Sequence, residues 1–114
     1  MSEVKECVSG VKIYLDDVRT PSPGSVDFTI CRTAEEAIKF IDSLNVVLIS
    51  FDHDLGTELT GYSVACHIEE RVYLGKMKCP RWIIHSANPV GRKQIQSAME
   101  SAMKYQKYRE DLKI

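Results

Sequence analysis

Two groups of acidic residues stand at the ends of apolar segments, and they indicate where this chain could carry out chemistry. The segment VKIYLDD ends in Asp16 and Asp17, and the segment VVLISFDHDLG carries Asp52, His53 and Asp54. An apolar run that stops at carboxylates is typical of a buried parallel strand, whose carboxyl end is where open α/β sheets bind ligands. Carboxylates gathered at one edge would repel one another. A hard divalent cation, Mg²⁺ or Mn²⁺, would relieve that repulsion.

The predicted metal ligands are Asp16, Asp17 and Asp52. Side chains of consecutive strand residues point to opposite faces, so Asp16 and Asp17 converge only if the chain turns there, as it does at a strand end. A cation held by these carboxylates would keep open positions for water and a phosphate oxygen. The alternative is that the aspartates only cap turns, where Asp is common. The two groups together favour metal-assisted phosphate chemistry.

Two histidines are the candidate proton carriers, together with one aspartate. His53 lies between two aspartates, and a neighbouring carboxylate such as Asp54 can fix its tautomer. His85 ends the segment WIIHS, which we expect beside the strand that leads to Asp52. Two histidines near one phosphate would supply a base for water and an acid for the leaving oxygen. The alternatives are a solvent-facing loop histidine at 53 and a hydrogen-bonded core histidine at 85.

Several polar residues are candidates for holding a phosphate. Ser86 could donate its hydroxyl, and the turn NPVGR opens a helix whose free N–H groups favour an anion. Arg92, in that turn, and Arg19, just after the first acidic pair, each add a guanidinium fork that suits a phosphate. We therefore predict four phosphate ligands, which are Ser86, Asn88, Arg92 and Arg19.

The rest of the chain has to position these residues, and its periodicity predicts strands that alternate with helices. Pro21 and Pro23 rule out a regular helix in the Pro/Gly/Ser-rich segment after the first strand. Short strands alternating with helices imply a parallel sheet, and right-handed crossovers leave few topologies, of which we expect strand order 2-1-3-4. We predict strands at residues 11–16, 28–32, 46–51 and 82–86, and helices that begin at Thr33 (with a capping box to Glu36), Thr60 and Asn88.

Length and composition predict one ordinary domain. The chain has 114 residues, which suits a single domain over residues 1–114 with a flexible lead-in at 1–10. No apolar run approaches the roughly 20 residues that span a membrane, and the first ten residues lack the apolar core of a signal peptide. We therefore expect a cytoplasmic protein without a membrane partner. Walker A, GxGxxG and GxSxG motifs are absent, which argues against a nucleoside triphosphatase, a dinucleotide enzyme and an α/β-hydrolase.

Charge is divided unevenly along the chain. Residues 1–70 carry 5 Lys/Arg and 13 Asp/Glu, whereas residues 71–114 carry 10 and 3. The acidic part fits a cation site. The basic part could attract a phosphate-bearing partner, or it could simply line the solvated face of the last helix.

The sequence resembles receiver domains and, more closely, the cyclic-phosphate processing receiver family. The blocks YLDDVRTP, RTAEEAI, ISFDHDLG, TGYSVA and HSANPVGR are similar to that family's signature and extend from residue 13 to about residue 95. The resemblance implies a three-layer, flavodoxin-like receiver fold. Against the receiver pattern, the first helix is replaced by a loop and the fifth strand, which carries the switch lysine, is absent. The resemblance also implies the processing of cyclic phosphates on RNA ends or nucleotides.

These observations favour an enzyme, a Mg²⁺-dependent phosphoesterase that acts on a cyclic phosphate of a small molecule or an RNA end. One alternative is a non-catalytic, receiver-like switch that is phosphorylated at Asp52. Another is a module that binds a nucleotide or nucleic acid, supported by the basic second half. Without a fifth strand the fourth strand is left at an exposed edge, which suits a homodimer.

Overall fold

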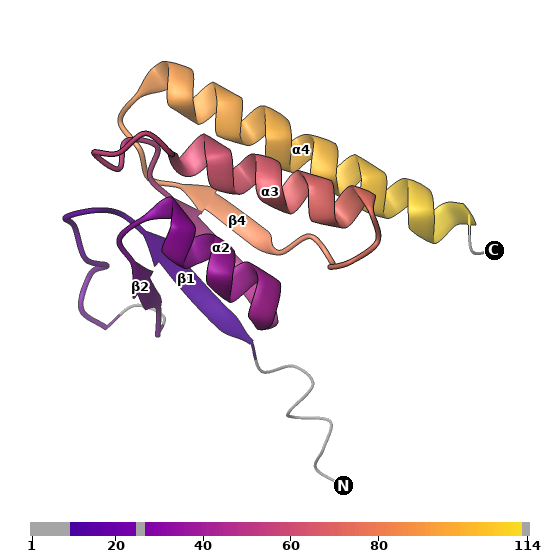
Figure 1. Cartoon of the computed structure of the whole chain (residues 1–114), viewed down its shortest axis with the longest axis horizontal. Helices are drawn as coiled ribbons and strands as arrows, with labels where there is room; N and C mark the ends of the chain where they lie inside the picture. Colours follow the sequence, from indigo (N-terminus) through magenta and orange to yellow (C-terminus); the bar gives the residue numbers. More distant parts are fainter. Residues whose placement is uncertain (1–9, 25–26, 113–114) are drawn as a thin grey trace, which may run out of the picture.

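The computed structural model describes residues 10–24 and 27–112, and its centre is a parallel sheet of four strands in the order β2-β1-β3-β4 (Figure 1). The predicted strand order is confirmed. The predicted lead-in lies, apart from Gly10, outside the described residues. The strands are β1 (Val11–Leu15), β2 (Thr29–Cys31), β3 (Val46–Phe51) and β4 (Arg81–Ile84), and the helices are α2 (Ala34–Ser43), α3 (Gly61–Tyr73) and α4 (Pro89–Leu112).

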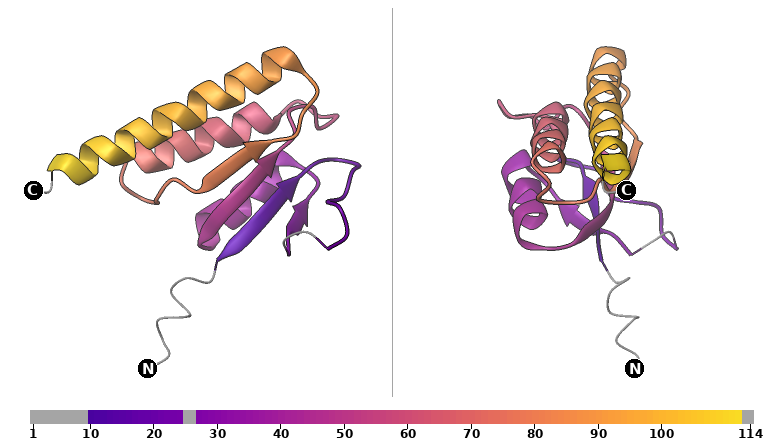
Figure 2. Two further views of the ribbon diagram at one scale, coloured as in Figure 1. Left: turned by 180° about the vertical axis from the view of Figure 1, so that it is seen from behind. Right: turned by 90° about the vertical axis from the view of Figure 1, so that its right-hand side faces the viewer.

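The two faces of the sheet are covered differently. Helices α2 and α3 lie over one face, and α4 packs along α3 (Figure 2). Side chains alternate accordingly, because Ile13 and Leu15 of β1 are fully buried whereas Tyr14 between them is only half-buried. Tyr14 aligns through Ser50 with Ile83, which is 53% exposed on the same face. The parallel sheet and its three helices confirm the predicted α/β fold. Within residues 10–24 and 27–112, however, no helix covers the face of Tyr14 and Ile83.

The handedness of the connections explains this difference. The crossovers from β2 to β3 and from β3 to β4 advance in one direction across the sheet, and right-handed crossovers that advance the same way place their helices on the same face. The connection from β1 to β2 runs in the opposite direction and would place a helix on the other face. Its described residues, 16–24 and 27–28, form no helix, as Pro21 and Pro23 predicted.

The helices begin close to the predicted residues, and their caps differ in detail. The backbone N–H of Glu36 donates to Thr33 Oγ1 (3.1 Å), as the capping box requires. The Glu36 carboxylate accepts from the backbone N–H of Arg32 (2.7 Å), one residue before the cap. At α3, the backbone N–H of Thr60 donates to Ser63 Oγ (3.0 Å). Among the described residues, no helix has the length and apolar character needed to cross a membrane.

Candidate functional site

The register of the sheet brings three of the predicted site residues together at its carboxyl edge. Leu15, Phe51 and Ile84 are aligned across β1, β3 and β4, so the residues that follow them, Asp16, Asp52 and His85, form a row. Backbone bonds continue the sheet through this row, from Asp52 N–H to Leu15 O (2.9 Å) and from His85 N–H to Phe51 O (2.8 Å). One ligand atom of each of the three side chains lies within 4.8 Å of the others.

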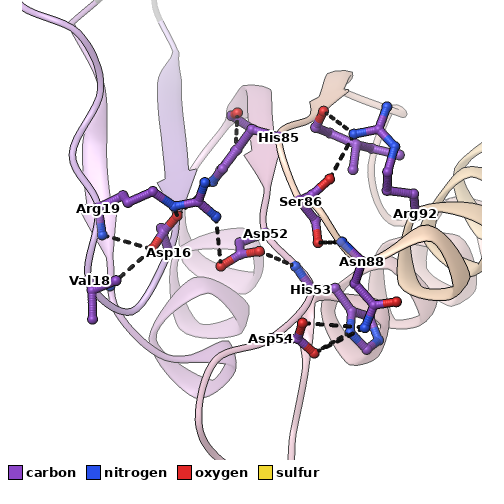
Figure 3. Close-up of polar contacts among 12 residues, drawn as sticks. Asp16, Val18, Arg19, Asp52, His53, Asp54, His85, Ser86, Asn88 and Arg92 are labelled. Carbon is purple, nitrogen blue, oxygen red and sulfur yellow. Dashed lines mark hydrogen bonds and ion pairs between the residues drawn. The ribbon is translucent and has the colours of Figure 1, made fainter.

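Asp16 is fully buried and both of its carboxylate oxygens have partners (Figure 3). Oδ1 accepts the backbone N–H groups of Val18 (2.9 Å) and Arg19 (2.8 Å), which turns the chain after β1. Oδ2 contacts Arg19 Nε (2.9 Å) and His85 Nε2 (3.0 Å). Burial by itself would raise the pKa of Asp16. The two backbone hydrogen bonds, with those from His85 and the charge of Arg19, more than offset burial and hold this pKa below its ordinary value.

Asp52 is nearly as buried as Asp16 and shares the same arginine. Its side chain is 7% exposed; Oδ1 accepts the backbone N–H of His53 (2.8 Å), and Oδ2 lies 3.5 Å from Arg19 Nη2. The Arg19 guanidinium therefore lies between the carboxylates of Asp16 and Asp52 (Figure 3). The charges of Asp16 and then Asp52 raise the pKa of Arg19, although its side chain is 52% exposed. We call Asp16, Arg19, Asp52 and His85 the carboxylate cluster.

His85 is held in one orientation by contacts on both ring nitrogens and on its face. Nδ1 lies 2.7 Å from Ser50 Oγ, and Nε2 lies 3.0 Å from Asp16 Oδ2. The ring stacks on Tyr14, with centroids 4.4 Å apart and planes 6° apart. We did not predict a role for Ser50. Its signal in the sequence is that it is the only polar residue of VVLISF, two positions before Asp52 and hence on the same side of the strand.

A second group of polar side chains joins the loop after β3 to the start of α4, and we call it the loop bridge. His53 Nδ1 lies 2.9 Å from Asp54 Oδ1, and Asn88 Nδ2 donates to both Asp54 oxygens (3.3 Å each). Asn88 Oδ1 accepts the backbone N–H of Gly91 (3.0 Å), and Ser86 Oγ accepts that of Asn88 (3.1 Å). The hydrogen bonds from His53 and then Asn88 lower the pKa of Asp54. The loop bridge comprises His53, Asp54, Ser86 and Asn88.

Two glycines allow the loops of the site to approach one another closely. A Cβ at Gly61 would lie 2.0 Å from the backbone oxygen of Asp52, and a Cβ at Gly91 would lie 2.3 Å from the ring of His53. Neither contact leaves room for a side chain. Glycine at these positions therefore lets α3 and α4 begin directly against the residues that follow β3.

Two predicted site residues belong to neither group. Arg92 Nη1 donates to the backbone oxygens of Ile84 (3.1 Å) and Ser86 (2.9 Å), so this arginine secures the end of β4. Asp17 is half-buried, and its Oδ2 would be 3.3 Å from a Cβ added at Gly56. Asp17 is not among the three residues whose ligand atoms come together, and its role as a metal ligand stays a prediction.

The residues of the carboxylate cluster fit a divalent cation. Two buried carboxylates supply the hard oxygen ligands that Mg²⁺ and Mn²⁺ prefer, and an imidazole nitrogen beside them can complete a set of three protein ligands. The position of the Arg19 guanidinium between the two carboxylates shows that this place attracts positive charge. Asp16, Asp52 and His85 are thus the residues that could hold a metal.

A large groove on the described part of the chain does not coincide with this chemistry. It lies between β4 and the second half of α4, has a volume of about 970 Å³, and is lined by Trp82 and Met103 among others. No member of the carboxylate cluster or the loop bridge lines it. The candidate site is therefore identified by its charges and hydrogen bonds and not by the size of a cavity.

Comparison with known proteins identifies a family for this chain. A search of protein families matches residues 11–101 to the cyclic-phosphate processing receiver domain. No curated protein and no solved structure gives a significant match. The matched segment runs from the start of β1 into α4 and contains every residue of the carboxylate cluster and of the loop bridge. The chain therefore belongs to the cyclic-phosphate processing receiver domain family.

Proposed function

We propose that this protein is a divalent-metal-dependent phosphoesterase that hydrolyses a cyclic phosphate on an RNA end or in a cyclic nucleotide. The observation that carries the proposal is the row formed by Asp16, Asp52 and His85, with two buried carboxylates that share one exposed arginine. The family description adds the cyclic phosphate. In the reaction, water adds its oxygen to phosphorus, one ring P–O bond breaks, and the leaving oxygen takes up a proton.

The carboxylates and Arg19 have separate tasks in this proposal. Asp16 and Asp52, with Asp17 as a further predicted ligand, hold Mg²⁺ or Mn²⁺. A bound cation would supply positive charge for the phosphate oxygens, a contribution worth several kcal/mol in metal-assisted reactions. Arg19 reaches both carboxylates and is half exposed, so its remaining donors can contact a phosphate from solvent.

The two histidines would transfer the protons of the reaction. His53 contacts Asp54 through Nδ1, which leaves Nε2 without a partner among residues 10–24 and 27–112 and able to exchange a proton with the substrate. We propose His85 as a proton carrier and not as a metal ligand: it is held between Ser50 and Asp16, and its Nε2 would exchange Asp16 for a substrate oxygen. In this arrangement Asp54 and Ser50 fix the orientation of the rings.

The remaining predicted phosphate ligands differ in how many donors they can still offer. The Ser86 hydroxyl accepts a backbone N–H, so its own hydrogen is left to donate to a phosphate oxygen. The amide of Asn88 donates to Asp54, and Arg92 donates to two backbone oxygens. We therefore propose Ser86 and Arg19 as the direct phosphate ligands, and Asn88 and Arg92 as residues that hold the loop around them.

The test is hydrolysis of a panel of 2′,3′- and 3′,5′-cyclic phosphates, both as nucleotides and as RNA ends. Each is incubated with Mg²⁺, with Mn²⁺ and with a chelator, and the products are followed by ³¹P NMR. We expect a phosphomonoester that forms only with metal and that disappears in the Asp52→Asn variant. If no cyclic phosphate is turned over under any of these conditions, the proposal is wrong.

A phosphorylated switch is the second candidate function, and the position of Asp52 favours it. Asp52 directly follows β3, in the middle of the sheet, where the resemblance to receivers places the phosphate-accepting aspartate. Incubation with acetyl phosphate and Mg²⁺, followed by intact-mass analysis, separates the two functions. A stable phosphoryl adduct that the Asp52→Asn variant does not form, without turnover of cyclic phosphates, would favour the switch.

A homodimer through the edge of the sheet is part of the proposal. β4 is an outermost strand, and the groove beside it carries both basic and acidic side chains, including Arg81, Lys104, Glu100 and Glu110. Mixed charges suit a two-fold contact in which basic residues of one copy face acidic residues of the other. Light scattering over a range of concentrations measures the mass, and Met103→Glu should shift a dimer toward monomer.

A further inference from the structure

We propose that Arg19 competes with the metal for the carboxylates of the site. The guanidinium holds Asp16 and Asp52 until a divalent cation takes its place, and the displaced guanidinium then binds the phosphate of the substrate. This inference rests on the proposed function, because it concerns the same cation and the same phosphate. The inference adds an exchange at the carboxylates of Asp16 and Asp52 between two positively charged groups, which are the Arg19 guanidinium and the divalent cation.

The first argument is that each carboxylate uses one oxygen for backbone N–H groups and turns the other toward Arg19. In Asp16, Oδ1 accepts two backbone N–H groups while Oδ2 faces Arg19 Nε at 2.9 Å. In Asp52, Oδ1 accepts the backbone N–H of His53 while Oδ2 faces Arg19 Nη2 at 3.5 Å. The oxygens not already used by the backbone are therefore the ones that Arg19 contacts. A cation and the guanidinium cannot both occupy the space between these two Oδ2 atoms.

The second argument is that the Arg19 side chain can leave without rearranging its loop. Its backbone is fixed at both ends, since its N–H donates to Asp16 Oδ1 (2.8 Å) and its carbonyl accepts from Arg32 Nη1 (2.7 Å). Arg32 Nη1 also donates to the backbone oxygen of Asp16 (3.0 Å). The Arg19 side chain, by contrast, is 52% exposed and extends from a turn rather than from a helix or strand. None of the bonds that fix the backbone uses an Oδ2 atom.

The third argument concerns charge. Two ionised carboxylates carry more negative charge than one guanidinium neutralises, so the cluster with Arg19 in place and with a neutral His85 retains an unbalanced negative charge. A divalent cation balances both carboxylates and also lets Arg19 go. Once the cation balances both buried carboxylates, release of the half-exposed guanidinium leaves no buried charge unpaired, and its donors can bond to water instead. A freed guanidinium held close to the cation by a fixed backbone is well placed to bind a phosphate with two parallel hydrogen bonds.

The experiment measures binding of Mn²⁺ alone by calorimetry and by EPR, at fixed pH and ionic strength. Arg19→Gln removes the competing charge and keeps the length of the side chain. We expect it to bind Mn²⁺ about tenfold more tightly than the parent protein, which corresponds to the loss of about 1.4 kcal/mol of competition. Arg32→Gln is the matched control, because it removes a positive charge near Asp16 that does not contact a carboxylate oxygen. It should tighten binding by less than about threefold, since it loses a screened charge and bonds to two backbone oxygens but no contact with a carboxylate oxygen.

A second measurement uses inorganic phosphate in the presence of saturating Mg²⁺. Here the effect of Arg19→Gln should reverse, with phosphate binding about tenfold weaker, because the displaced guanidinium is missing. A residue with a purely structural role would not tighten one ligand and weaken the other. Circular dichroism should show the same fold for all variants. Unchanged phosphate binding in Arg19→Gln would overturn the second half of the inference.

The possible outcomes separate this inference from the proposed function. If Arg19→Gln and Arg32→Gln tighten Mn²⁺ binding equally, or if Arg19→Gln does not tighten it, the competition is wrong while metal dependence stands. If Arg19→Gln alone tightens binding but no cyclic phosphate is hydrolysed, the competition stands and the hydrolase is wrong. If no variant binds Mn²⁺, both the competition and the metal dependence are wrong.

Discussion

The carboxylate cluster and the loop bridge lie side by side at one edge of the sheet, yet they are built on opposite principles (Figure 3). The cluster places two acids in the interior and balances only part of their charge with a half-exposed arginine. The loop bridge uses a largely exposed aspartate, Asp54, whose partners His53 and Asn88 belong to the two loops it joins. The carboxylate cluster can therefore bind a further positive charge, whereas the polar atoms of the loop bridge are mostly hydrogen-bonded to one another.

This difference indicates where binding capacity and where structural support are located. Arg19 can be replaced at the carboxylates by another cation without loss of a backbone hydrogen bond. Asn88 has no such freedom, because its side chain both caps α4 through Gly91 and donates to Asp54. We therefore expect substitutions in the carboxylate cluster to act mainly on activity and metal binding, and substitution of Asn88 in the loop bridge to act more on stability.

The largest expected effect is at Asp52. Asp52→Asn keeps the volume and the oxygen that accepts the His53 N–H, but it removes the charge that would face a bound cation. We expect kcat/KM for a cyclic phosphate to fall by roughly 10³-fold or more, because several kcal/mol of metal-based stabilisation are lost. The melting temperature without metal should stay level or rise, since repulsion from Asp16 is relieved. A large fall in the melting temperature would show that Asp52 is structural.

The next effect distinguishes the two histidines. His85→Ala and His53→Ala should each lower kcat by roughly 10²–10⁴-fold if the two rings share the proton transfers. The double variant should lose much less than the product of the two, because the residues act together. Should His53→Ala lower only the melting temperature, the chemistry would be confined to the carboxylate cluster and the loop bridge would be purely structural. Rates and melting curves of the three variants decide this.

The third effect is the dependence of stability on pH. The pKa of Asp16 is lower in the folded protein than its ordinary value of 3.8, so the ionised form stabilises the fold. This contribution is fully present above about pH 3.8 and is lost as the pH falls below that value toward the lowered pKa of the folded state. We expect the melting temperature to fall on acidification over this range. In Asp16→Asn the fall should be shallower, and equally steep curves would contradict a stabilising Asp16.

The smallest effect is at the start of α4. Asn88→Ala removes the hydrogen bond to the Gly91 N–H and the two bonds to Asp54, and should lower the free energy of unfolding by about 1 kcal/mol, as the loss of a helix cap does. Asn88→Ser is the control, because serine can still cap the helix. If both variants raise KM for the cyclic phosphate while stability is unchanged, Asn88 is a direct phosphate ligand, as the sequence predicted.

Much of the fold could be predicted because local patterns and handedness determine it. Two strands were predicted from the apolar runs at residues 46–51 and 82–86. The start of a helix was predicted from the capping threonine at 33, and a loop from the prolines at 21 and 23. Which face of the sheet has no helix among the described residues depends on the direction in which each crossover runs, and local patterns alone do not show that direction.

The sequence by itself determined which residue types stand at strand ends, because the end of an apolar run is a local property that puts Asp16, Asp52 and His85 at one edge. Only the tertiary structure decided which of them meet. The register of the strands places Asp16 with Asp52 and His85, whereas Asp17 lies beside Gly56. It also brings Ser50 into contact with His85, which is 35 residues away in the sequence. The roles of the arginines were also decided there. A long side chain reaches whatever the folded backbone places near it, so Arg92 secures β4 while Arg19 joins two buried carboxylates.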